Sequence, residues 1–98
     1  MKTVKILGHD YKIIIDRRLN HTSNNSAMCF SDDLEIVIDS NIPQSRKEED
    51  LLHEIVEAIN FHLELNLEHR NIQGLSECLY SVLKDNGLID LSNMLVEG

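Results

Sequence analysis

The stretch LLHEIVEAIN, residues 51–60, contains residue types with which proteins hold a catalytic metal. In the helical motif H-E-x-x-H, two histidines one turn apart bind zinc, and the glutamate between them acts as a general base. His53 and Glu54 match the beginning of this motif, but Glu57 stands at the second ligand position. Because a carboxylate is also a zinc ligand, three interpretations are open: a broken metal site, a metal site with a different ligand set, or an ordinary acidic helix.

Helical geometry predicts where these side chains point. Each residue turns about 100°, so Glu57 lies about 40° from His53, one turn along the same side. The predicted core stripe lies roughly 200–300° from His53 and consists of Leu52, Ile55, Val56, Ile59 and Leu63. His53 and Glu57 are therefore expected at the edge of the buried face, where packing holds a ligand while one side stays open to water. Glu54, at about 100°, is expected to point away from the core beside them.

The other histidines differ in what the sequence says about them. His62 lies about 180° from His53 on the same wheel, so it cannot join the same site and is expected at the surface. His9 and His21 lie in turn or loop segments, which give no geometric argument. His69 stands in the first turn of a second helix, after a short connection that favours antiparallel packing. It is therefore expected to approach the first helix, and its distance from His53 depends on the crossing angle.

Two pairs of β-rich runs precede these helices. VKILG and YKIIID flank residues 8–10, and SAMCF and LEIVID flank residues 31–33, so each pair predicts a hairpin. In LEIVID, Leu34, Ile36 and Ile38 alternate with polar or exposed positions, as in a half-buried strand. The polar stretch 17–25 has no periodicity and is expected to be a poorly ordered loop.

Capping signals bound the two helices. The first is expected from about residue 46 to 65, with Ser45 and Glu48 forming a capping box after Pro43. Asn66 is expected to cap the second helix, and Gly87, after Asn86, to end it. Strands followed by helices predict an α+β domain of residues 1–98, a small antiparallel sheet of hairpins with two antiparallel helices. The pattern assigns no element to the tail, residues 88–98.

Composition excludes several classes of protein. The net charge is −8, from 9 Lys and Arg against 17 Asp and Glu, which argues against a nucleic-acid binder. No segment has the roughly 18 apolar residues of a membrane span, and the beginning of the chain lacks a signal-peptide core. These observations predict a cytoplasmic protein that does not interact with membranes. Cys29 and Cys78 are expected to be reduced, buried thiols rather than ligands or a disulfide.

Three stretches of the chain resemble a known family. They are ILGHDYKI, LEIVIDSNIP leading into EEDLLHEIVEAIN, and LNLEHRNIQGLSECLYSVLKDNGL, within residues 2–87. The resemblance is to the short zincin-like metallopeptidases of phages and prophages, and its last stretch is more specific than H-E-x-x-E. The commoner form of that family has histidine at the position of Glu57 and an acid at that of His69. The resemblance therefore implies a permuted Zn²⁺ site of His53, Glu57 and His69, with the fourth position left to water.

Further expectations follow from this resemblance. It implies a zinc-dependent metallopeptidase with Glu54 as general base and a peptide or protein substrate extended along LEIVID or SAMCF as an edge strand. Tyr80 is interpreted as a core residue. One alternative is a non-catalytic zinc-binding or metal-free adaptor of a mobile element, whose acidic surface meets a basic partner. Another is a plain α+β protein in which His53 and Glu57 are only an i,i+4 pair, contributing about 0.2–0.5 kcal/mol.

Overall fold

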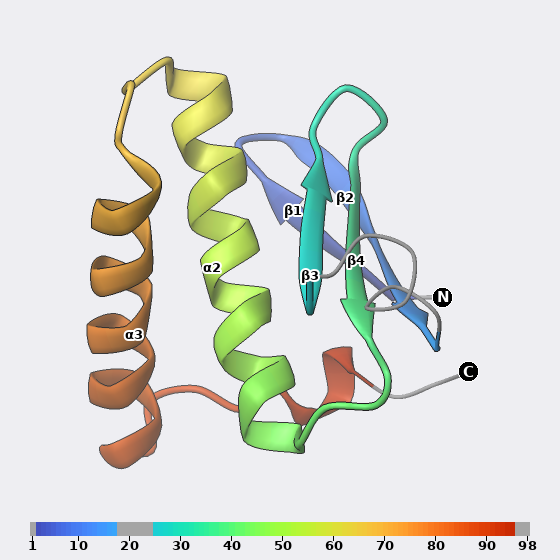
Figure 1. The fold of residues 1–98 in the computed structure, drawn as a ribbon, viewed down its shortest axis with the longest axis vertical. Coiled ribbons are helices and arrows are strands. Elements are labelled where there is room, and N and C mark those ends of the chain that lie inside the picture. Colours follow the sequence, from blue (N-terminus) through green and yellow to red (C-terminus); the bar gives the residue numbers. More distant parts are fainter. Residues whose placement is uncertain (1, 18–24, 96–98) are drawn as a thin grey trace.

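The computed structural model describes residues 2–17 and 25–95. The elements are β1 (Lys2–Ile6), β2 (His9–Asp16), β3 (Ala27–Phe30), β4 (Glu35–Asp39), α2 (Gln44–Leu63), α3 (His69–Asp85) and the 3₁₀ helix η1 (Ser92–Met94). Helix α2 lies between the sheet on one side and α3 on the other (Figure 1). The α+β class is therefore confirmed. Most of the predicted 17–25 loop, including His21, lies outside the described residues.

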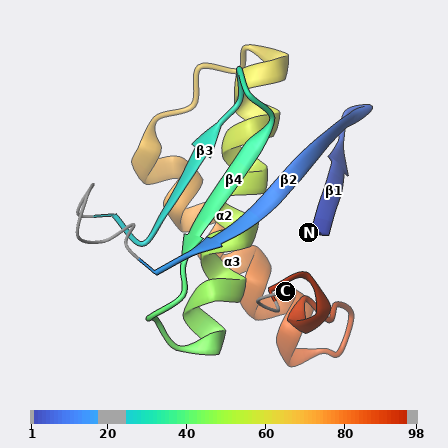
Figure 2. The ribbon, with the colours of Figure 1, turned by 90° about the vertical axis from the view of Figure 1, so that its right-hand side faces the viewer.

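The sheet is mixed rather than antiparallel. Its strand order is β1-β2-β4-β3, which can be followed from edge to edge in Figure 2. The two predicted hairpins, β1–β2 and β3–β4, are antiparallel, but β2 and β4 pair in parallel. The prediction of a purely antiparallel sheet is thus wrong. Parallel pairing places β2 and β4 in the centre of the sheet, where Ile36 and Ile38 of β4 are fully buried. Residues 17–34 provide the long connection that parallel strands need.

The core lies between the sheet and α2. It consists of Ile6, Tyr11, Ile13, Ile36, Ile38, Leu51, Ala58 and Leu95. Leu95 follows η1 and is only 4% exposed, so part of the tail to which the sequence assigned no element closes one end of this core. Neither long helix among the described residues has the extended apolar run that crossing a bilayer requires.

Helix α2 begins differently from the prediction. Its N-cap is Pro43, and Ser45 lies inside the helix without a capping hydrogen bond, so the predicted capping box is wrong. Glu48 is instead buried and accepts hydrogen bonds from Gln44 Nε2 (3.0 Å), Tyr80 OH (2.8 Å) and Lys84 Nζ (3.1 Å). Burial opposes ionisation, but these partners outweigh it and the pKa of Glu48 lies below its ordinary value. The network holds the end of α3 against the start of α2.

Removing one hydroxyl from this network is expected to destabilise the fold. Tyr80 is 8% exposed, which confirms it as a core residue, and its hydroxyl links Glu48 to Lys84. Tyr80→Phe should lower the free energy of unfolding by about 1–2 kcal/mol, because the buried Glu48 loses a partner. Urea denaturation measures the change, with the exposed Ser81→Ala as control. Equal stability of Tyr80→Phe and wild type would show that this network is not stabilising.

The connection between the helices uses left-handed backbone rather than a cap at Asn66. Glu64 and Asn66 have φ values of 52° and 57°, and the N-cap of α3 is Glu68. Asn60 Oδ1 accepts a hydrogen bond from the Leu67 N–H at 3.0 Å, which ties the connection to α2. At its other end α3 stops as predicted: Gly87 has φ 65°, and its N–H and that of Leu88 bond to the Lys84 and Leu83 carbonyls.

Candidate metal centre

His53 is held in a defined orientation between α2 and α3. It is 7% exposed, and its Nδ1 lies 3.3 Å from Ser76 Oγ. The Ser76 hydroxyl donates its proton to the Ile72 carbonyl, so Ser76 Oγ is left to accept from Nδ1–H. This arrangement favours the tautomer in which His53 Nε2 carries a free lone pair, and it turns that atom towards Glu57.

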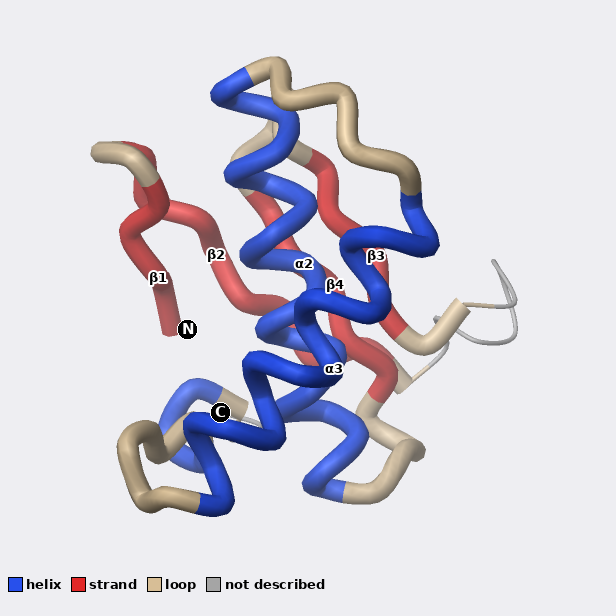
Figure 3. The backbone as a smooth tube through the Cα atoms, turned by 90° about the vertical axis from the view of Figure 1, so that its left-hand side faces the viewer, coloured by secondary structure: helices blue, strands red, loops and turns tan. Residues whose placement is uncertain are grey.

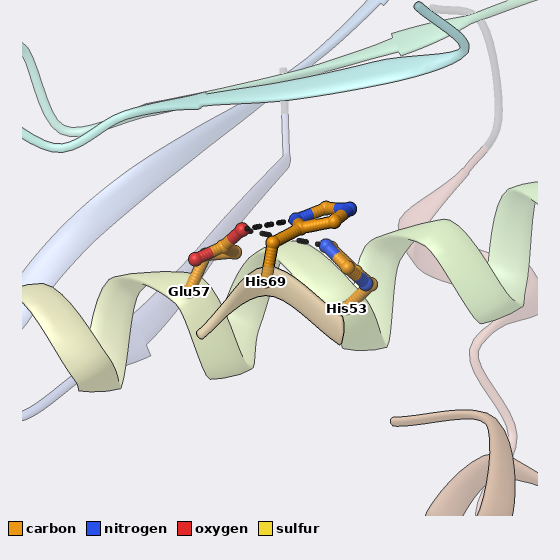
Figure 4. A group of neighbouring side chains, drawn as sticks. All are labelled: His53, Glu57 and His69. Atoms are coloured by element: carbon orange, nitrogen blue, oxygen red, sulfur yellow. Dashed lines mark hydrogen bonds and ion pairs between the residues drawn. The ribbon is translucent and has the colours of Figure 1, made fainter. Parts of the chain in front are cut away.

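Glu57 connects the two histidines. Its Oε2 lies 3.4 Å from His53 Nε2 and 3.4 Å from His69 Nδ1, and the two imidazole rings have centroids 5.0 Å apart. Figure 4 shows the three side chains turned towards one another, two from α2 and one from the start of α3. The His53 side chain is 9% exposed and that of His69 74%. The cluster is therefore anchored on one side and open to solvent on the other.

The path of α3 brings His69 to this place. In Figure 3, α3 runs along α2 on the face away from the sheet. The left-handed residues Glu64 and Asn66 reverse the chain within a short connection, and the Glu48 network fixes the other end of α3. His69 is the first residue of α3 and lies one turn before the buried Ile72. The packing of α3 on α2 therefore brings His69 to Glu57 and His53.

The two distances to Glu57 are compatible with a metal ion held between the three side chains. The three donor atoms all lie within 4.8 Å of one another, and this is the one such group of His, Cys, Asp or Glu among the residues that the structure describes. A tetrahedral zinc with bonds of about 2.0–2.1 Å separates its ligand atoms by about 3.3–3.5 Å, and both Glu57 distances are 3.4 Å. Two imidazole nitrogens and a carboxylate also suit other first-row metals. The same contacts describe an ion pair when a histidine is protonated.

Glu54 is buried, contrary to the prediction that it points away from the core. It is 8% exposed, because β3 covers the side of α2 that a helical wheel alone leaves open. Burial, with Glu57 and Asp50 nearby, raises the pKa of Glu54 to about 8. No hydrogen bond or ion pair joins its carboxyl to any other part of the chain described by the structure. Because no fully buried polar side-chain atom of the described residues lacks a partner, the Glu54 oxygens reach the solvent of the clefts that the residue lines. Ionising a largely buried carboxyl that has no partner is costly, and such groups are typical of functional sites.

Two clefts meet at Glu54. One, of about 570 Å³, lies between β3 with its following turn and the second half of α2, and Glu57 is on its wall. The other, of about 380 Å³, is lined by His53, His69 and Gln73 among others. Glu54 lines both, so its carboxyl stands where the open side of the His53–Glu57–His69 cluster can be reached from solvent.

Comparisons with protein families, with curated proteins and with solved structures gave no significant match to this chain. The relationship to zincin-like phage metallopeptidases therefore stays a proposal, supported by the residues of this chain alone.

The remaining histidines and cysteines have other surroundings. His62 does not join His53, as expected, but it is half-buried: Tyr11 OH lies 2.6 Å from its Nε2, and His9 stacks on it with ring centroids 4.6 Å apart. Both cysteines are free thiols, but Cys78 is exposed and Cys29 only half-buried, so the expectation that both are buried is wrong.

Sequence reasoning missed Ser76. It is 1% exposed and lies one turn from both Ile72 and Tyr80, in the buried stripe of α3. A serine at an otherwise apolar position of a helix was the available signal, because a buried hydroxyl needs a partner. In the structure one partner is the Ile72 carbonyl and the other is His53.

Proposed function

We propose that this protein is a zinc-dependent hydrolase of peptide bonds, with His53, Glu57 and His69 as zinc ligands. The observation that carries the proposal is the meeting of three donor atoms within 4.8 Å beside Glu54, a buried carboxyl without a partner. Three protein ligands with one open side are typical of catalytic rather than structural zinc. The resemblance of the chain to zincin-like metallopeptidases of phages and prophages supports the same function.

Each residue has a separate role in this proposal. Zinc, when bound, acidifies the water that it holds and polarises a carbonyl oxygen. Glu54 accepts the proton of the attacking water and passes it to the leaving nitrogen, and its raised pKa suits both transfers. Ser76 holds His53 through Nδ1, which keeps Nε2 available as a ligand atom.

The sheet offers one place for an extended peptide beside this centre. LEIVID forms the interior strand β4, whereas SAMCF forms β3, the last strand of the sheet. Of these two strands, β3 alone has an open edge beside α2, with no strand on its outer side within the described residues. A substrate that pairs with this edge by backbone hydrogen bonds passes the mouth of both clefts.

A second candidate function is that of an adaptor that binds another protein. The observation that favours it lies on α3, where Leu75, Leu79 and Val82 are 53%, 37% and 54% exposed. These residues lie on one face of the helix, and an exposed apolar face of this kind often contacts a partner. An adaptor needs neither Glu54 nor a metal, so zinc dependence separates the two functions.

Metal removal and restoration test the proposal. Protein stripped with a chelator is expected to be inactive towards a mixed peptide library, and one equivalent of Zn²⁺ per chain should restore cleavage, read by mass spectrometry. Mg²⁺, which prefers six oxygen ligands, should not restore it. Absence of zinc binding at micromolar concentrations would overturn the proposal, and bound zinc without cleavage of any library peptide would favour the adaptor.

A further inference from the structure

The larger cleft has apolar walls and an acidic mouth. Phe30 at the end of β3 and Phe61 on α2 both line it and are 39% and 51% exposed. Asp32 and Asp33, in the turn after β3, are exposed and line the same cleft. Aromatic surface left open beside carboxylates has the composition of a binding site rather than of an ordinary polar turn.

The acidic groups of this cleft have no basic counterpart. Four carboxyl groups line it, those of Asp32, Asp33, Glu54 and Glu57, and no Lys, Arg or His does so among the described residues. Acidic residues in an exposed turn are common and would carry little alone. Glu54 is an independent observation that points to a ligand. The residue is only 8% exposed, it has no hydrogen-bond or ion-pair partner for its carboxyl among the described residues, and it lines the cleft.

We propose that this cleft receives a lysine or arginine side chain of the peptide substrate, from a residue next to the bond that is cleaved. The inference rests on the proposed peptidase function and names the substrate class. Glu57 belongs both to the metal cluster and to the wall of the cleft, and Phe61 lies one turn further along α2. A side chain entering beside the metal therefore runs along Phe61 towards Asp32 and Asp33.

Long cationic side chains match each part of this path. Their methylene stems pack on apolar surface while the charged head reaches polar groups, and a cation is also attracted to the face of an aromatic ring. An uncharged apolar side chain would cover the carboxylates without replacing their water. An acidic side chain would be repelled by them. The preference should therefore be strongest for Lys and Arg and weakest for Glu.

Peptides that differ at one residue test this inference. Matched peptides with Lys, Arg, norleucine or Glu at that position are titrated by NMR into ¹⁵N-labelled metal-free protein, which cannot complicate binding by cleavage. Lys and Arg peptides are expected to bind about 3- to 10-fold more tightly than norleucine at low salt, as for two partly screened charge pairs. The largest shifts should fall on the amides of residues 30–33 and 61, and the preference should shrink at high salt.

Two pairs of substitutions make the test specific. Asp32→Asn with Asp33→Asn should abolish the Lys preference, whereas Asp10→Asn with Asp85→Asn, which removes the same charge away from the cleft, should keep it. Equal binding of Lys and norleucine peptides, or shifts outside the cleft, would overturn the inference.

Cleavage by the zinc-loaded protein separates this inference from the proposed function. A higher kcat/KM for Lys and Arg peptides than for norleucine supports both. Equal cleavage of all peptides overturns the charge preference and leaves the peptidase standing. Preferential binding of Lys peptides without any hydrolysis supports the cleft as a peptide site and contradicts catalysis.

Discussion

Replacing His69 with alanine is expected to weaken zinc binding by on the order of a hundredfold, since structural sites with four protein ligands bind zinc by about 10–16 kcal/mol, roughly a quarter of it for each ligand. Because the His69 side chain is 74% exposed, its removal should change the stability of the metal-free protein by less than about 0.5 kcal/mol. Loss of zinc can then be assigned to the missing ligand rather than to unfolding. Competition with a chromophoric chelator measures the affinity.

His53 and His62 provide the comparison for this result. His53→Ala should lose zinc to a similar or greater extent, but it also removes a buried side chain, so circular dichroism must confirm the fold. His62→Ala alters the same helix and should keep the wild-type zinc affinity, since His62 contacts Tyr11 and His9 instead. A His69→Ala variant with unchanged zinc affinity would remove His69 from the ligand set.

Glu54→Gln is expected to lower peptide hydrolysis by about 10²–10⁴-fold while zinc remains bound. Glutamine keeps the shape of the side chain but cannot accept the proton, and His53, Glu57 and His69 are unchanged. The measurement is kcat/KM together with zinc content. Glu64→Gln, at the exposed end of the same helix and outside both clefts, is the matched control and should keep activity. If Glu54→Gln cleaves as fast as wild type, Glu54 has no part in the chemistry.

The same substitution should stabilise the metal-free protein. The pKa of Glu54 is raised from its ordinary value of 4.5 to about 8, so the folded state binds a proton more tightly than the unfolded state. Wild type should therefore lose stability as pH rises from about 4.5 to about 8, on the order of 2–4 kcal/mol. Glu54→Gln should lack this loss. Urea denaturation of both proteins with chelator at pH 5 and pH 8.5 measures this difference in stability. A residue that lowers stability is typical of function rather than of folding.

Local sequence patterns predicted the elements but not all of their neighbours. LEIVID and the β-rich YKIIID correctly indicated strands, and Asn86-Gly87 correctly indicated the end of α3. The half-buried alternation expected of LEIVID is wrong, because Val37 and Asp39 of β4 are buried as well. The parallel pairing of β2 with β4 could not be predicted from local patterns. The two hairpins satisfy the same local rules whether β2 and β4 pair in parallel or antiparallel, and only the burial of these central strands selects the parallel arrangement. The capping box at Ser45 failed for a similar reason, since Glu48 bonds to Tyr80, 32 residues away.

The sequence also predicted the candidate ligands of the site but not the backbone that brings them together. Helical spacing placed His53 and Glu57 on one side, and antiparallel helices were expected to bring His69 near. The actual approach depends on left-handed backbone at Glu64 and Asn66. Asparagine adopts this conformation more readily than most residues, but glutamate does not, so Glu64 gave no sequence signal. The burial of Glu54 depends on β3, a part of the structure that a wheel of α2 does not contain.

X-ray absorption at the zinc edge, on protein loaded with one equivalent of Zn²⁺, tests the metal centre most directly. Four ligands are expected at about 2.0–2.2 Å, all nitrogen or oxygen, with scattering from two imidazole rings in wild type and from one ring in His69→Ala. A shell that contains sulfur at about 2.3 Å, or a spectrum unchanged by His69→Ala, would contradict a zinc site built from His53, Glu57 and His69.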